Sequence, residues 1–150
     1  MMKDGPVPLF VHGVIEYLAG VLFIAAPILL DFESGSATGV SVAIGVLVLV
    51  IAATTVGPTG LIPRIPVSVH ATLDYVLAAV LIASPFLFSF SDESAPTVFF
   101  IGLGIAHLLL TIATRFRPHD EAHEEPAEAH EEPREESIQS PAEGPPPARP

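Results

Sequence analysis

Four long apolar stretches dominate the sequence, at roughly residues 8–30, 39–57, 67–89 and 96–114. About 20 residues of α-helix cross the roughly 30 Å hydrocarbon core of a bilayer, so each stretch is long enough to span a membrane. Half of the 150 residues are hydrophobic, and little sequence remains from which a water-soluble core could form. The sequence therefore predicts an all-α protein built as a four-helix transmembrane bundle.

The first and third stretches are related in sequence. Residues 11–32 align without a gap with residues 69–90, at an offset of 58, and eight of the 22 aligned positions are identical. The second and fourth stretches match less well, and we align them at an offset of 57, which pairs Gly45 with Gly102. A repeat of this length predicts two helical hairpins in tandem. Because each hairpin has an even number of spans, the two are expected to be parallel, related by an axis along the membrane normal.

Four segments follow from this pattern. We expect a first transmembrane hairpin (1–57), a linker (58–66), a second transmembrane hairpin (67–117) and a tail (118–150). The linker contains three prolines and a glycine, which break helices. The tail holds ten acidic and two basic residues and is rich in proline, so it accounts for most of the net charge of −11. This composition predicts a disordered acidic tail.

Basic residues predict the orientation in the membrane. Lys3, Arg64, Arg115 and Arg117 lie near the N-terminus, in the linker and after the fourth stretch, whereas the two remaining loops contain no lysine or arginine. By the positive-inside rule, both termini should face the cytoplasm, with the chain in the cell (inner) membrane. The lipid bilayer is therefore the expected partner, and the acidic composition excludes a nucleic-acid partner.

Several functional classes lack their sequence signature. There is no cysteine, which excludes disulfides, thiolate metal sites and thiol redox chemistry. The sequence contains no Ser–His–Asp set, phosphate-binding loop or dinucleotide fingerprint. We therefore expect no cofactor and no evident catalytic activity.

Ionisable residues within the apolar stretches are the strongest functional signal. His12 and Glu16 are four residues apart, and so are His70 and Asp74. On a helix this spacing places both groups on one face. Ionisable groups at membrane depth face the bundle interior and are candidates for function. The repeat is expected to place the two faces opposite each other, which predicts a buried polar cluster between the hairpins.

Three further polar residues are candidates for the same cluster. Tyr17 and Tyr75 directly follow the two carboxylates, and His107 lies in the middle of the fourth stretch. At the offset of 57, His107 has no counterpart, because Val50 occupies the matching position. A histidine of this kind is usually a core polar group, and an additional ligand is the alternative.

Three interpretations of the cluster remain open. In the favoured one, histidines and carboxylates satisfy each other and hold the hairpins in register. In the second, the cluster binds a proton or a small ligand, with histidine as the switch. In the third, two histidines and two carboxylates bind zinc, iron or manganese. A transport role would also require a homo-oligomer, because one chain of this size does not enclose a path.

The ends of the first and third stretches resemble a known family. The sequences IAAPILLDF and IASPFLFSF are similar to the repeat of the SPW family, small integral membrane proteins named for a Ser-Pro-Trp at the end of a helix. Ser84 and Pro85 match the first two positions of that motif, and Phe86 replaces the tryptophan. In the first repeat only Pro27 is retained. The resemblance implies a four-helix membrane fold and carries no established activity with it.

Overall fold

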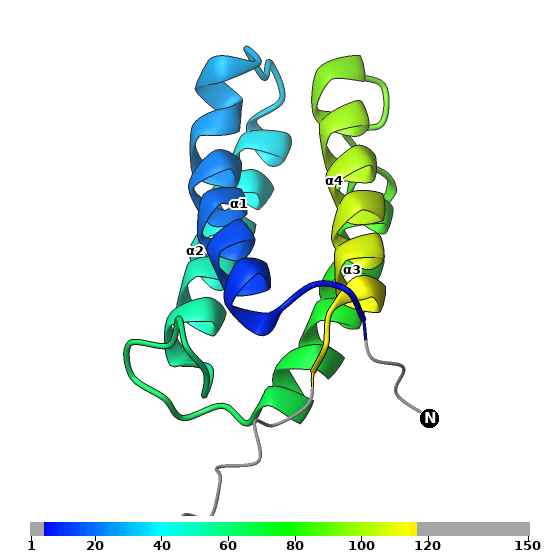
Figure 1. Cartoon of the computed structure of the whole chain (residues 1–150). Coiled ribbons are helices and arrows are strands. Elements are labelled where there is room, and N and C mark those ends of the chain that lie inside the picture. The colour runs from blue at the N-terminus through cyan, green and yellow to red at the C-terminus, as the bar shows by residue number, and fades with distance from the viewer. Residues whose placement is uncertain (1–4, 117–150) are drawn as a thin grey trace, which may run out of the picture. The chain divides into compact units, whose positions relative to one another are not determined.

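A computed structural model describes residues 5–116 of the chain (Figure 1). The described residues form four α-helices: α1 (Leu9–Leu29), α2 (Gly35–Thr54), α3 (Val67–Leu87) and α4 (Ser94–Ala113). They contain no β-strand, and each helix is long and apolar enough to cross a membrane. The predicted all-α bundle of four membrane-spanning helices is thereby confirmed. The segment expected to form the acidic tail, 118–150, lies outside the described residues.

The helices are arranged as two hairpins (Figure 1). Helix α1 packs along α2, and α3 packs along α4, whereas direct backbone approach between the hairpins is sparse. The two short interhelical loops lie at one end, and the linker lies at the other together with the segments that precede α1 and follow α4 (Figure 1). The hairpins therefore run in parallel, and the linker end brings together the starts of α1 and α3.

Helices α1 and α3 end in the same way. Asp31, just after α1, adopts a positive φ of 52°, and Ser89, just after α3, adopts 55°. The N–H of Phe32 then donates to the carbonyl of Pro27 at 3.0 Å. This is the hydrogen bond of a Schellman motif, which closes a helix by bonding carbonyls that the last turn leaves free. Pro27 thus lies inside the last turn of α1, and Pro85 lies likewise in α3.

A proline inside a membrane helix leaves one carbonyl without its usual donor. Pro27 has no N–H for the carbonyl of Phe23, four residues earlier. The hydroxyl of Ser41, on α2, donates to that carbonyl at 2.6 Å and is itself buried. The neighbouring helix therefore supplies the missing hydrogen bond, which is how membrane helices tolerate proline.

The register between the second helices of the two repeats differs from the predicted one. The bounds of α2 and α4 are offset by 59 residues, so Gly45 is equivalent to Gly104 and not to Gly102. A Cβ at Gly45 would lie 2.7 Å from Ile24, and one at Gly104 would lie 2.8 Å from Ile82, the equivalent residue. Gly102 faces open space. The predicted offset of 57 was wrong because two residues rotate a helix face by about 200°.

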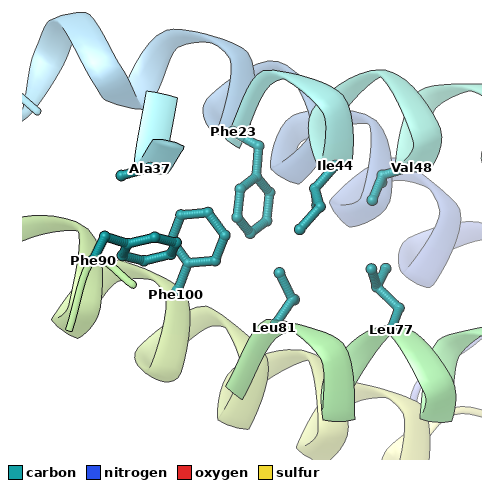
Figure 2. Packing of buried hydrophobic residues seen from close by; sticks show 8 residues of the cluster. All are labelled: Phe23, Ala37, Ile44, Val48, Leu77, Leu81, Phe90 and Phe100. Carbon is teal, nitrogen blue, oxygen red and sulfur yellow. The ribbon is translucent and has the colours of Figure 1, made fainter. Parts of the chain in front are cut away.

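The hydrophobic core lies between the hairpins (Figure 2). Phe23, Ile44 and Val48 of the first hairpin face Leu77 and Leu81 of the second (Figure 2). Phe100 packs against Phe23 and Phe90 toward the end that carries the short loops, with ring centroids 5.6 and 5.1 Å apart. This end of the bundle interior is therefore closed by aromatic side chains.

The outer faces of the helices are also apolar. Leu18 on α1 is 66% exposed and Val98 on α4 is 71% exposed, and many other large aliphatic side chains are exposed beside them. Soluble proteins rarely expose such continuous apolar surface. Lipid, which is as apolar as these side chains, is the solvent that suits this surface.

Candidate functional site

Four ionisable side chains converge inside the linker end of the bundle. His12 and Glu16 come from α1, and His70 and Asp74 come from α3. All four are buried, and each supplies a nitrogen or oxygen atom that lies within 4.8 Å of the other three. The spacing of four residues places each histidine and its carboxylate on one helix face, and the parallel hairpins bring the two faces together. We call this set the His–carboxylate cluster.

The four distances between histidine nitrogens and carboxylate oxygens in the His–carboxylate cluster are similar. Asp74 Oδ2 lies 3.3 Å from His12 Nε2 and 3.4 Å from His70 Nε2. Glu16 Oε2 lies 3.3 Å from His70 Nε2, and Glu16 Oε1 lies 3.6 Å from His12 Nε2. Both imidazoles therefore direct Nε2 at the same two carboxylates.

Two threonines determine which nitrogen of each imidazole carries a proton. The Oγ1 of Thr114 lies 2.7 Å from His12 Nδ1 and donates its own proton to the carbonyl of Leu110 at 2.7 Å. The hydroxyl can then only accept from the histidine, so Nδ1 bears hydrogen. Thr55 holds His70 in the same way, at 2.8 Å. In the neutral imidazole, the lone pair is therefore on Nε2 and points into the cluster.

Each threonine also joins one hairpin to the first helix of the other repeat. Thr114 follows α4 and binds the histidine of α1, while Thr55 follows α2 and binds the histidine of α3. Backbone bridges reinforce both junctions, between Val7 and Thr114 and between Ile65 and Thr55. These threonines were not among the residues predicted from the sequence. Their signal in the sequence is a threonine directly after each second helix, 59 residues apart.

The contacts between histidines and carboxylates, at 3.3–3.6 Å, are longer than charge-assisted hydrogen bonds. Charge-assisted N–H···O bonds measure about 2.7–2.9 Å. Within the described residues, His12 Nε2 and Asp74 Oδ2 are buried without a hydrogen-bond partner. A tetrahedral ion with about 2.0–2.1 Å bonds to nitrogen and oxygen separates its ligand atoms by about 3.3–3.4 Å. The four nitrogen–oxygen distances of 3.3–3.6 Å, which involve both oxygens of Glu16, are close to that spacing, and one ligand atom from each of the four residues lies within 4.8 Å of the other three.

The family model of the SPW repeat domain matches residues 10–114, which cover both hairpins. The chain belongs to the SPW repeat family. This membership, together with four apolar helices of spanning length, identifies a multi-pass membrane protein. Comparison with curated proteins and with solved structures finds no match.

The residues of the SPW motif lie at the end opposite the His–carboxylate cluster. Ser84 and Pro85 are fully buried in the last turn of α3, and the Ser84 hydroxyl donates to the carbonyl of Val80 at 2.7 Å. Phe86, at the tryptophan position, is 65% exposed and faces away from the bundle. In this SPW repeat protein the motif therefore shapes the helix end and does not contribute side chains to the cluster.

The two tyrosines of the SPW repeat protein lie outside the His–carboxylate cluster. The hydroxyl of Tyr17 donates to the backbone carbonyl of Thr59 in the linker at 3.1 Å. Tyr75 is 48% exposed. Each tyrosine directly follows a cluster carboxylate, and because one residue turns a helix by about 100°, the tyrosine lies on a different face from the carboxylate. The hydrogen bond of Tyr17 instead fastens the linker to α1.

His107 lies at the margin of the cluster. Its Nε2 is 3.7 Å from Asp74 Oδ1, and within the described residues this nitrogen has no hydrogen-bond partner. At the observed offset of 59, its equivalent in the first repeat is Val48 and not Val50. At this position the second repeat of the SPW protein therefore carries an imidazole where the first repeat carries an isopropyl group.

Proposed function

We propose that this SPW repeat protein is an integral membrane protein that holds one divalent transition-metal ion in the His–carboxylate cluster. The observation that carries the proposal is the convergence of two Nε2 atoms and two carboxylates, with nitrogen–oxygen distances of 3.3–3.6 Å and with both Nδ1 atoms held by threonine hydroxyls. Metal-bound histidines almost always donate their second ring N–H to an oxygen acceptor, usually a carboxylate, a backbone carbonyl or water, and the threonine hydroxyls are oxygen acceptors in that position. The geometry therefore favours a metal centre over histidines and carboxylates that merely satisfy each other.

The charge of the cluster supports the same proposal. Two neutral imidazoles and the carboxylates of Glu16 and Asp74 carry a net charge of −2, which a divalent cation cancels. A neutral centre suits a site surrounded by hydrocarbon, where an uncompensated charge is costly. Two nitrogen and two carboxylate ligands suit zinc, iron and manganese, and zinc prefers the tetrahedral arrangement.

The surroundings of the cluster support a resident ion over a transported one. A small pocket that includes Thr55, Thr59 and Gly57 reaches the cluster from the linker. Toward the other end, the interior is lined by aliphatic side chains and closed by Phe23 and Phe100. An ion can therefore approach from the linker end, but beyond Glu16 and His107 the cavity toward the other end is lined only by apolar side chains.

Metal analysis tests the proposal directly. Protein purified in detergent should retain about one zinc, iron or manganese ion per chain, measured by inductively coupled plasma mass spectrometry. The double variant His12→Ala/His70→Ala should retain none, because half of the ligands are lost. Glu16→Gln provides a second variant for the case in which the double variant does not fold, as judged by circular dichroism.

Histidines in the C-terminal segment provide the matched control. The triple variant His119→Ala/His123→Ala/His130→Ala removes three histidines that could capture metal nonspecifically, and it should keep the ion. Loss of the ion in this variant, or a parent protein that binds none of the three metals at micromolar concentration, would overturn the metal proposal. The second result would favour the structural interpretation of the cluster.

We also propose that the linker end faces the cytoplasm of a cell with the chain in its inner membrane. The four basic residues near helix ends support this orientation. Because the chain has no cysteine, single cysteines can report it. In intact cells a membrane-impermeant maleimide should label Asp92→Cys, in the α3–α4 loop, and should not label Leu61→Cys, in the linker. The reverse pattern would contradict the proposed orientation.

A further inference from the structure

A cavity of about 280 Å³ lies beside the His–carboxylate cluster, between the hairpins. Glu16 and His107 are the polar residues of its lining, and the remaining lining residues are apolar, Phe23 and Leu81 among them. Two residues of its wall, Ile15 on α1 and Ala106 on α4, are exposed. These exposed wall residues indicate that the cavity opens sideways between α1 and α4, toward the surroundings of the helices.

The cavity is also where the two repeats differ in chemistry. Val48 and His107 occupy equivalent positions of α2 and α4, and both line the cavity. His107 Nε2 is buried, and within residues 5–116 it has no hydrogen-bond partner. Valine is sufficient to fill the core at this position, as Val48 of the first repeat shows. The imidazole adds a second polar side chain to a cavity whose lining is otherwise apolar apart from Glu16.

The access route indicates what kind of molecule the cavity takes. A ligand that enters between α1 and α4 comes from the bilayer, where its apolar part is already surrounded by hydrocarbon. Moving that part into the cavity gains little, because lipid is as apolar as leucine. A polar head group, in contrast, lacks partners in hydrocarbon and gains hydrogen bonds at Glu16 and His107. Affinity should therefore depend on the head group.

The two polar residues determine which head group fits. The Glu16 carboxylate accepts a hydrogen bond, and an imidazole N–H of His107 donates one. A hydroxyl group does both at once, as donor to Glu16 and acceptor from His107. A carbonyl group can only accept, and a carboxylate would be repelled by Glu16 and Asp74. We propose that the cavity binds a membrane-dissolved alcohol, an uncharged molecule with an apolar body and one hydroxyl head group.

This inference shares Glu16 with the proposed metal centre but does not require the ion. The test uses the full chain in lipid nanodiscs and the photoreactive alcohol 3-azioctanol, with labelled residues mapped by mass spectrometry. Labels should fall on cavity-lining residues of α1 and α4. An excess of 1-decanol should suppress them, whereas decane, which lacks the hydroxyl, should not.

The variant His107→Val reproduces the side chain of the first repeat and should fold. It should reduce decanol-sensitive labelling about tenfold, the effect of one lost hydrogen bond in a buried site. Leu109→Val, on the exposed face of the same helix, is the matched control and should label as the parent does. Labels spread over the lipid-facing helix surfaces, equal competition by decane, or full labelling of His107→Val would each overturn the proposal.

Metal content separates the two proposals. The labelling is repeated on protein stripped of metal by a chelator and on protein loaded with zinc, with the ion counted in both samples. Decanol-sensitive cavity labels in a protein that never binds metal would support the alcohol site and overturn the metal centre. One ion per chain without cavity labels would do the reverse.

Discussion

Replacing Thr55 and Thr114 by valine in one variant is expected to weaken metal binding by about 100-fold or more. Each threonine accepts a hydrogen bond from the Nδ1–H of a cluster histidine, at 2.8 and 2.7 Å. Valine has nearly the same shape but no hydroxyl, so each ring loses the partner that orients it and directs the lone pair of Nε2 into the cluster. Losing one such partner typically costs about 10–100-fold in metal affinity. Competition with a zinc-binding dye measures the change.

Serine distinguishes the hydroxyl from the packing of the methyl group. Thr55→Ser/Thr114→Ser keeps both acceptors and should bind zinc within about tenfold of the parent. Thr72→Val removes the hydroxyl of an exposed threonine that bonds only its own helix, at Ser68, and should have no effect. If the double valine variant bound zinc as tightly as the parent does, the threonines would not orient metal ligands. The hydrogen assigned to Nδ1 of each histidine would then have no effect on metal binding.

The helices and their pairing were predictable because hydropathy and the repeat act over many residues. The bounds of α1 to α4 lie within a few residues of the predicted stretches, except that α2 begins at Gly35, four residues before the predicted 39. Ser34 explains this earlier start, since its hydroxyl accepts from the N–H of Ala37 as an N-terminal cap. Hydropathy does not detect a polar first turn of a helix, and the start of such a helix is determined by its N-terminal cap.

The convergence of His12, Glu16, His70 and Asp74 was accessible from the sequence because it follows from helix periodicity and the repeat. The threonines were not accessible, since they bind across the hairpins and their position depends on how the chain crosses from α2 to α3. The role of the cluster was not accessible either. Spacing along a helix does not distinguish short hydrogen bonds from the contacts of 3.3–3.6 Å observed, and the proposed metal centre depends on that difference.

The register of α2 and α4 shows most clearly where sequence comparison fails. The segment GLG offers two glycines for alignment with Gly45, and only one can face α3. A Cβ at Gly104 would lie 3.0 Å from Leu81 Cβ, whereas Gly102 has no neighbour within 4 Å. Identity alone cannot choose between them, because the choice depends on which face of the helix packs closely.

Substitution of these glycines by leucine tests the register with a large effect. At Gly45, a Cβ would lie 2.6 Å from the carbonyl oxygen of Gly20, so α1 and α2 would have to separate. Gly45→Leu should therefore lower the free energy of unfolding by about 3 kcal/mol or abolish folding. Gly104→Leu should be destabilising for the same reason, with a smaller effect, because its nearest neighbour is a flexible Ile82 side-chain atom. Thermal unfolding in detergent measures both changes.

Gly102→Leu is the decisive comparison, because it changes the same residue type only two positions from Gly104. Gly102 faces open space, and leucine at this position should change the free energy of unfolding by no more than about 0.5 kcal/mol. If instead Gly102→Leu were as harmful as Gly45→Leu while Gly104→Leu were tolerated, the offset would be 57 after all. His107 would then turn away from Asp74, and the asymmetry between Val48 and His107 would no longer lie in the cavity.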